Sequence, residues 1–342
     1  MKTSLWLALA IGLNTLQPAV GAPAQSKPSA FEALVPEDSK PAVIAEGLKW
    51  AEGPVWIPEQ AALLFSDVPN NRIYRWSEGG AAALFLEPSG GTVKKGFREP
   101  GSNGLKRGPV GTIIMADQGN RAVALLDLRT HAKRLLVERY AGKRLNSPND
   151  VAVGPDGSIW FTDPPYGLDG LDESPLKEQD ANGVYRLAPN GRVTRVESRL
   201  AFPNGLAFTP DGRTLYVSTS DPKNPVIMAY RLGSDGRVMS RRLFADFSAA
   251  AKDGKPGLPD GMTVDERGNV WATAPGGVHV LSPTGHEIGL IAHDKAISNC
   301  AFGGPDGRTL FLTATDQVLA LKTNVRGAPA RLPRIPRRSS QP

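Results

Sequence analysis

The chain has 342 residues, 40% of them apolar, so it can bury a sizeable core as one large domain or two. Its net charge of +6 does not indicate a nucleic-acid partner, because five arginines lie within residues 323–342 and, without these and Lys2, the body of the chain is neutral. The single cysteine, Cys300, excludes an internal disulfide and is expected to be a small buried hydrophobe.

The first two dozen residues have the pattern of a secretory signal peptide. Lys2 precedes an uncharged apolar run from Leu5 to Leu16, and Ala22-Pro23-Ala24 offers small residues for cleavage. The run is short for a membrane span, and an uncleaved anchor is the alternative. We therefore predict that residues 1–24 are removed and that the mature protein is periplasmic or secreted, with no membrane contact.

The two ends of the mature chain differ in composition from its body. Residues 25–42 are polar and proline-rich and are predicted to form an N-terminal extension, with a short helix from Phe31 to Leu34. Residues 323–342 are rich in proline and arginine and lack acids, a composition typical of disorder. A basic docking peptide is the alternative for this tail.

Between these ends lie short runs of β-branched and aromatic residues, such as Ile113-Ile114-Met115 and Ile159-Trp160-Phe161. Asp-Gly and Asn-Gly pairs, which are common hairpin turns, separate the runs. No long stretch has the periodicity of an amphipathic helix. The pattern therefore predicts antiparallel hairpins.

One polar residue recurs at the start of an apolar strand in six copies. A glycine follows eight residues later in five copies, and an apolar residue follows eleven residues later in all six. The polar residues are Glu52, Asn103, Asn149, Asn204, Asp260 and Asn299. The copies are 39 to 56 residues apart, the length of four short strands with their turns. We therefore predict an all-β fold, a six-bladed β-propeller over residues 43–322; a two-sheet sandwich is the alternative, but it would not explain the register.

Equivalent positions of the innermost strands meet around the axis of a propeller, so the six polar side chains are expected to converge at one end of the channel. Glu52 and Asp260 supply carboxylates and the other four supply amides, which are oxygen ligands for Ca²⁺, Mg²⁺ or Mn²⁺. Zinc usually recruits His or Cys, and no copy has either at this position. Asn-Gly and Asp-Gly are also common turns, but the repeat already has its turn at the later glycine. The joint pattern favours a metal site.

Several strings resemble the signature segments of the regucalcin/gluconolactonase (senescence marker protein-like) family. They include Ala51–Trp56, Ser147–Val151, Phe202–Leu206 and Pro259–Met262. The likeness covers nearly the whole mature chain, and it is strongest to exported bacterial gluconolactonases, through Phe97–Gly104, Thr162–Leu168, Leu171–Ser174 and Ser298–Cys300. The resemblance implies a six-bladed propeller that hydrolyses sugar lactones with one divalent metal, held by the counterparts of Glu52, Asn149, Asn204 and Asp260. Ca²⁺ is the expected ion, and Mg²⁺, Mn²⁺ and Zn²⁺ are the alternatives.

The resemblance has one departure. Animal regucalcins carry an arginine two residues before the counterpart of Asn149, where it faces the sugar, and this chain has Ser147 at that place. The sugar contacts of that branch therefore do not transfer to this chain.

Contacts to the substrate are expected from four residues. Asn103 and Asn299 come from the two blades that supply no metal ligand, and they would bind substrate hydroxyls or support the ligands. Asp163 and Tyr166 lie in a proline-rich loop, where they would contact the sugar or only serve a rigid loop. The loop over residues 97–102 leaves the same two possibilities open.

The predicted reaction is the hydrolysis of a sugar lactone, glucono-1,5-lactone to gluconate, in which a metal ion polarises the carbonyl and activates water. Asp260 is the candidate general base, and Glu52 is an alternative that the sequence does not separate from it. A calcium-stabilised binding propeller without catalysis is a second reading, and the same site acting on another lactone or an organophosphate ester is a third. The sequence does not predict the oligomeric state.

Overall fold

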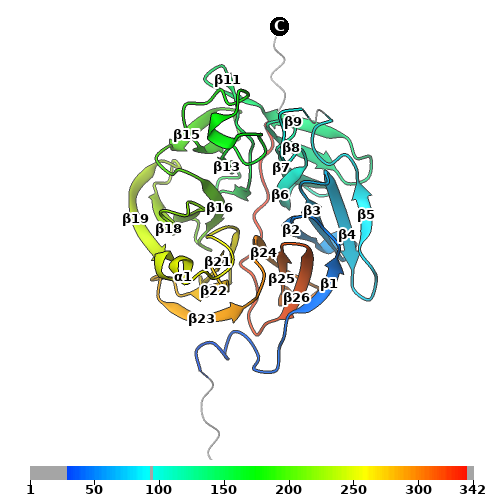
Figure 1. The fold of residues 1–342 in the computed structure, drawn as a ribbon, viewed down its shortest axis with the longest axis vertical. Helices are drawn as coiled ribbons and strands as arrows, with labels where there is room; N and C mark the ends of the chain where they lie inside the picture. Colours follow the sequence, from blue (N-terminus) through cyan, green and yellow to red (C-terminus); the bar gives the residue numbers. More distant parts are fainter. Residues whose placement is uncertain (1–28, 93–94, 337–342) are drawn as a thin grey trace, which may run out of the picture.

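The computed structural model describes residues 29–92 and 95–336. It confirms the predicted fold: six antiparallel four-stranded sheets surround a central axis as the blades of a propeller (Figure 1). Within each of the first five blades, the strands follow one another in chain order from the axis outward. The innermost strands are therefore the ones that carry the recurring polar residue.

The strands have the following bounds. The first three blades contain β2 (Ala51–Ile57), β3 (Ala62–Asp67), β4 (Arg72–Ser77) and β5 (Ala83–Leu86); β6 (Ser102–Arg107), β7 (Thr112–Asp117), β8 (Ala122–Asp127) and β9 (Lys133–Val137); and β12 (Val151–Val153), β13 (Ile159–Asp163), β14 (Gly183–Leu187) and β15 (Val193–Glu197). The last three contain β16 (Pro203–Phe208), β17 (Thr214–Thr219), β18 (Val226–Leu232) and β19 (Val238–Asp246); β20 (Met262–Val264), β21 (Val270–Ala274), β22 (Gly277–Leu281) and β23 (Glu287–Ala292); and β24 (Asn299–Gly303), β25 (Thr309–Ala314), β26 (Gln317–Lys322) and β1 (Ala42–Glu46).

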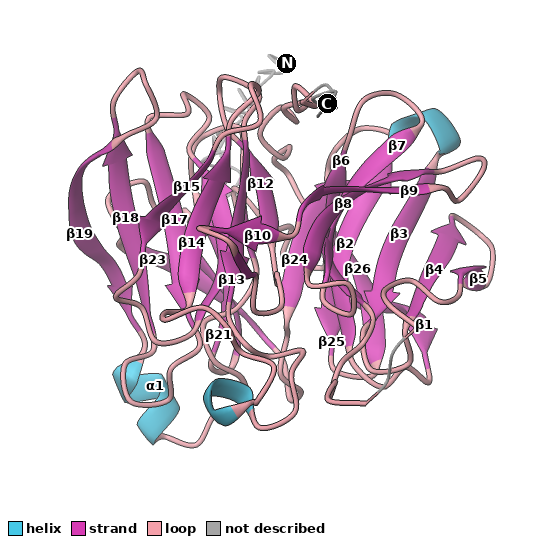
Figure 2. Cartoon of the chain, turned by 90° about the horizontal axis from the view of Figure 1, so that it is seen from above, coloured by secondary structure: helices cyan, strands magenta, loops and turns pink. Residues whose placement is uncertain are grey.

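Little of the chain lies outside the blades. A small hairpin joins β10 (Arg139–Tyr140) to β11 (Lys143–Arg144), and the helical segments are η1 (Pro58–Gln60), η2 (Leu171–Glu173) and α1 (Ser248–Lys252) (Figure 2). Within residues 29–92 and 95–336, no helix has both the length and the apolarity needed to cross a membrane. The predicted signal peptide lies outside the described residues.

The ring is closed by strands from the two ends of the propeller. β1 forms the outer edge of the sixth blade, where Ala42 pairs with Ala320 and Glu46 with Gln317 of β26. The closing blade thus joins the first and last strands by backbone hydrogen bonds, so the ring cannot open without breaking this ladder.

The recurring glycines occupy the turn between the first and second strands of a blade. All five, Gly111, Gly157, Gly212, Gly268 and Gly307, have φ between 71° and 86°, the left-handed region in which a side chain is strained. The first blade lacks the glycine, and there Ala61 adopts φ 44° after η1. The register of the repeat therefore follows from the geometry of this turn.

The hydrophobic core lies between neighbouring blades, where the apolar position of the repeat is buried. Trp160 packs edge-on against Phe208 of the next blade, with ring centroids 5.6 Å apart. Trp271 packs against Cys300 and Leu310 of the sixth blade. Each such buried ring contributes roughly 2–3 kcal/mol relative to an exposed one. Cys300 is buried as expected.

The N-terminal extension packs against this core. Residues 30–34 form turns rather than the expected short helix, and Leu34 and Val35 are buried on the fifth and sixth blades. The Leu34 carbonyl accepts a hydrogen bond from the backbone of Asn324, so the extension also contacts the segment that follows β26.

Residues 323–336, which we call the C-terminal strap, are packed in extended form. This part of the tail therefore differs from the predicted disorder. The strap crosses the centre of the ring in Figure 1. Val325 is fully buried, and Ala328 donates its N–H to the carbonyl of Val264. The arginine-rich composition misleads because Arg331 donates to the carbonyls of Thr209 and Pro210 instead of being solvated. The remaining tail residues lie outside the described part of the chain.

Candidate active site

The structure brings five of the six recurring polar residues to one cavity. Each lies at the start of an innermost strand or just before it, as the register predicts. The cavity has a volume of about 710 Å³, and the recurring polar residues that line it are Glu52, Asn103, Asn149, Asn204 and Asp260. They come from five different blades, so only the closed ring assembles them.

Asn299, the sixth polar residue, lies behind Glu52 rather than in the cavity. Its Nδ2 donates to Glu52 Oε2 at 3.1 Å, and its Oδ1 accepts the N–H of Cys300 at 2.9 Å. The N–H of Gly53 also donates to Glu52 Oε2, at 2.9 Å. Of the two roles predicted for Asn299, the support of a ligand fits this geometry and a contact with substrate does not.

The two carboxylates of the site are held close together in a buried place. Burial raises the pKa of Glu52 to about 8, and the charges of Asp150 and Glu99 add to the effect. Burial also raises the pKa of Asp260 well above its usual range, and the nearby charge of Glu52 raises it further. Two such groups without a cation favour the protonated form, so a positive charge between them would be strongly stabilised.

The donor atoms of the site fit a hard cation. The buried Oδ1 atoms of Asp260 and Asn103 accept no hydrogen bond from the described residues. Asn204 donates its Nδ2 to Ser220 Oγ at 2.8 Å, an orientation in which its oxygen is the amide atom left for another partner. Oxygen atoms from carboxylates and amides, unpaired and facing one cavity, are what Ca²⁺ or Mg²⁺ would use as ligands.

Asp163 and Tyr166, both predicted to lie in the proline-rich loop, differ in the structure: Asp163 is the last residue of β13, and Tyr166 lies in the loop after it. Tyr166 lines the cavity; its ring stacks on Phe202 at 5.8 Å, and its buried hydroxyl has no partner among the described residues. Asp163 does not line the cavity. Its Oδ2 accepts the N–H of Asn146 at 2.8 Å, and burial raises its pKa to about 7. Asp163 therefore orders the segment that leads to Asn149.

Sequence reasoning missed an apolar side of the cavity. Trp50, Leu258 and Ile297 line it, and each lies two residues before a recurring polar position. The repeat carries the signal for these residues, because three of its six copies have a large apolar side chain from this set two residues before the polar position. Glu99, whose side chain is only 13% exposed, also lines the cavity.

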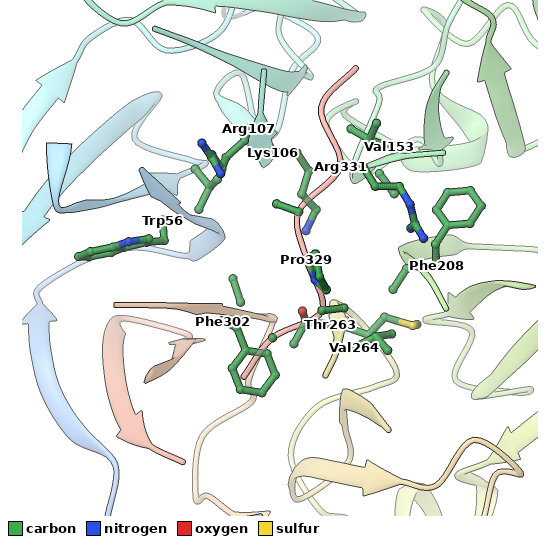
Figure 3. Close-up of a pocket in the computed structure, with 18 of the residues that line it drawn as sticks. Trp56, Lys106, Arg107, Val153, Phe208, Thr263, Val264, Phe302, Pro329 and Arg331 are labelled. Atoms are coloured by element: carbon green, nitrogen blue, oxygen red, sulfur yellow. The ribbon is translucent and has the colours of Figure 1, made fainter. Parts of the chain in front are cut away.

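A second cavity lies at the opposite mouth of the channel, between the innermost strands and the C-terminal strap (Figure 3). It has a volume of about 190 Å³, and its lining is mostly apolar, with Lys106, Arg107 and Arg331 as the charged residues. Because its described lining contains no carboxylate, this cavity does not suit a cation. The candidate active site is therefore the first cavity.

A six-bladed propeller with carboxylate and amide oxygens converging on an axial cavity defines the class of this protein. The chain belongs to the family described as SMP-30/Gluconolactonase/LRE-like region, whose family model matches residues 50–316. This result confirms the resemblance seen in the sequence.

Three relatives illustrate the likeness. The chain is 46% identical over 291 residues to a gluconolactonase of Zymomonas mobilis, covering 83% of this chain and 82% of that protein. A solved gluconolactonase structure from Xanthomonas campestris is 34% identical, with a TM-score of 0.74, covering 87% of this chain and 93% of that one. A calcium-binding protein, regucalcin from Agrobacterium tumefaciens, is 21% identical with a TM-score of 0.69, covering 86% and 97%, and this likeness concerns the fold alone.

Proposed function

We propose that this protein is a metal-dependent lactonase that hydrolyses glucono-1,5-lactone to gluconate. Its class, a lactone-hydrolysing enzyme of the gluconolactonase type, follows from the family and from relatives that cover most of both chains. The metal dependence and the particular lactone are the proposed parts. The observation that supports them most is the convergence of unpaired oxygen atoms on one cavity.

The proposed metal ligands are Glu52, Asn149, Asn204 and Asp260, and the proposed ion is Ca²⁺. All four side chains supply oxygen, and none supplies the nitrogen or sulfur that zinc prefers. A bound divalent ion would supply Lewis acidity, which polarises a carbonyl and lowers the pKa of water.

The residues of the chain would handle the proton of the attacking water. The water oxygen forms a bond to the lactone carbonyl carbon, and a carboxylate accepts the proton that the water loses. Asp260 is the candidate, because its Oδ1 accepts no hydrogen bond from the described residues. The ring C–O bond then breaks, and the departing oxygen takes up a proton to become a hydroxyl group of the open acid.

Asn103 and Tyr166 are the proposed contacts to the sugar. Both line the cavity, and Asn103 Oδ1 and the Tyr166 hydroxyl are buried without a partner among the described residues. A polyhydroxylated ring would satisfy these atoms, whereas an unsubstituted ring would leave them unpaired, which costs about 1–3 kcal/mol for each group.

A substrate panel measured with and without chelator tests this proposal. We expect glucono-1,5-lactone to be hydrolysed well above its spontaneous rate in the presence of Ca²⁺, and δ-valerolactone to have a kcat/KM lower by about a hundredfold or more. Proton release, corrected for spontaneous hydrolysis, measures both. If both lactones are hydrolysed only at the spontaneous rate with metal bound, a binding propeller without catalysis is favoured. If an organophosphate ester is turned over faster than the lactones, the same metal site acting on organophosphate esters is favoured.

A further inference from the structure

Two loops of the second and third blades are joined into one wall of the cavity. Phe97, in the loop before β6, forms an isolated β-bridge with Leu168, in the loop after β13. The N–H groups of Arg98 and Glu99 both donate to the carbonyl of Gly167, at 3.0 and 3.3 Å. The wall is therefore held by backbone hydrogen bonds, and the side chains of residues 98 and 99 are carried on a fixed support.

Glu99 presents a half-paired carboxylate on this wall. Its side chain lines the cavity and is 13% exposed. Arg98 donates to Glu99 Oε1 from both Nε and Nη2, at 3.1 and 2.7 Å. No hydrogen bond from the described residues reaches Oε2. One carboxylate oxygen is thus fixed by the guanidinium, and the other has capacity to accept hydrogen bonds from a ligand.

The carboxylate of Glu99 lies near the metal ligands but outside their ring. Glu99 lines the same cavity as Glu52 and Asp260. It precedes Asn103 by four residues, in the loop that leads into β6, and it occupies no position of the sixfold register. Glu99 is therefore placed to meet a part of the substrate other than the reacting carbonyl.

The opposite side of the cavity is apolar. Leu258 and Ile297 come from the fifth and sixth blades, across the ring from the wall of the second and third blades, and Trp50 continues this side onto the first blade. A sugar ring presents both carbon–hydrogen surface and hydroxyl groups. An apolar side facing a carboxylate wall would orient such a ring with its hydroxyls toward Glu99.

We propose that Glu99 is a specificity-determining residue, which accepts hydrogen bonds from the hydroxyls of the lactone, and that Arg98 is the residue that positions it. This inference rests on the lactonase function proposed above. A hydrogen bond to a carboxylate is worth about ten- to a hundredfold in binding, so Glu99 contributes a large share of the preference for hydroxylated lactones.

The competing role for Glu99 is that of a general base. Burial raises the pKa of Glu99, whereas the guanidinium of Arg98 acts against this rise and fixes one carboxylate oxygen with two hydrogen bonds. A carboxylate held in this way can still accept hydrogen bonds from hydroxyl groups through its other oxygen. The two roles differ in a measurable way. A base acts on every lactone and through kcat, whereas a hydroxyl acceptor acts only on hydroxylated lactones and mainly through KM.

The test compares Glu99→Gln with the wild type as full-length, Ca²⁺-loaded enzymes. Glu87→Gln is the matched control, because Glu87 also accepts two bonds from an arginine, Arg72, and does not line the cavity. We expect Glu99→Gln to lower kcat/KM for glucono-1,5-lactone by about ten- to a hundredfold, mostly through KM. Its kcat/KM for δ-valerolactone should stay within about twofold of the wild type. The control should change neither.

Calorimetric Ca²⁺ binding and the unfolding temperature of each variant separate the possible outcomes. Equal losses on both lactones, or weaker Ca²⁺ binding by Glu99→Gln, would overturn the inference, since Glu99 would then serve the chemistry or the metal. Unchanged kinetics on both lactones in a folded variant would also overturn it. A wild type that accelerates neither lactone would instead reject the proposed function and, with it, this inference.

Discussion

Four of the acidic residues at and near the channel show how surroundings decide what a carboxyl group can do. Glu52 and Asp260 face the cavity, Asp163 is tied to the backbone of Asn146, and both oxygens of Asp150 accept backbone N–H groups, from Val151 and Leu206. Burial raises the pKa of each. Among these four, Glu52 and Asp260 are the ones that combine a raised pKa with a place in the cavity, so they are the pair on which the proposed metal site depends.

Removing one charge from the pair Glu52 and Asp260 should weaken metal binding and leave the protein folded. Glu52→Gln and Asp260→Asn keep the shape of each side chain and relieve the repulsion between the two carboxylates. We expect folded propellers whose Ca²⁺ affinity is lower by about a hundredfold or more, with little lactonase activity. Calorimetric Ca²⁺ titration and circular dichroism measure the two properties. Full activity in either variant would remove that residue from the mechanism.

The raised pKa of Glu52 also predicts a pH dependence. Because the folded, metal-free protein binds this proton more tightly than the unfolded chain does, its stability should fall as pH rises toward about 8. Metal binding requires the ionised carboxylates, so Ca²⁺ affinity should rise over the same range. The difference in Tm between Ca²⁺-loaded and metal-free protein should therefore be larger at about pH 9 than at about pH 6. An equal difference at both values would contradict the assignment.

At the scale of the element, the start of each innermost strand is the functional unit. The polar residue, the later glycine and the buried apolar residue are all set by one strand pair and its turn. Such a unit can be predicted from sequence, because its three positions lie within a dozen residues and each has a local reason: a ligand, a positive φ and a place in the core.

The parts that sequence could not predict depend on distant partners. The strap donates hydrogen bonds to the carbonyls of Val264 and Thr209, which are remote in sequence. Its own sequence has no periodic pattern that would predict these contacts. Asp163 ends β13 and Tyr166 lies in the loop after it, and local sequence shows that both are polar but not that Asp163 turns toward Asn146. The apolar side of the cavity, in contrast, could have been predicted, because Trp50 lies at a fixed place in the repeat, two residues before Glu52.

The strap should stabilise the propeller without serving the active site, since it covers the opposite mouth of the channel. A chain that ends at Lys322 would expose the apolar cavity and lose the burial of Val325, a loss of about 3 kcal/mol that lowers Tm by roughly 5–10 °C. Its kcat on glucono-1,5-lactone at low temperature should match that of the full chain. Differential scanning calorimetry checks the first expectation, and an unchanged Tm would show that the strap adds no stability.

At the scale of the whole molecule, the fold is a ring that one composite blade closes. β1 lies some 275 residues from its partner β26 in sequence, so the five lining residues meet only when this last ladder has formed. The metal site is thus a property of the complete ring. No single blade carries more than one of its proposed ligands.

We also propose that the protein is exported, from the pattern of Lys2, the apolar run over residues 5–16 and the small residues at 22–24. The mature chain should then begin near Gln25 and be recovered from the periplasm or the medium. N-terminal sequencing of the protein from its native cell is the measurement. Recovery of Met1 from the cytosol would contradict the proposal.

The central claim, a lactonase that works through one metal ion in the axial cavity, can be tested by a single titration. The enzyme is stripped with chelator, its metal content is checked by elemental analysis, and Ca²⁺ is added back while hydrolysis of glucono-1,5-lactone is followed by proton release. The account predicts background rates in the stripped enzyme and activity that rises in proportion to added Ca²⁺ up to one ion per chain. Full activity in an enzyme shown to be free of metal would contradict it.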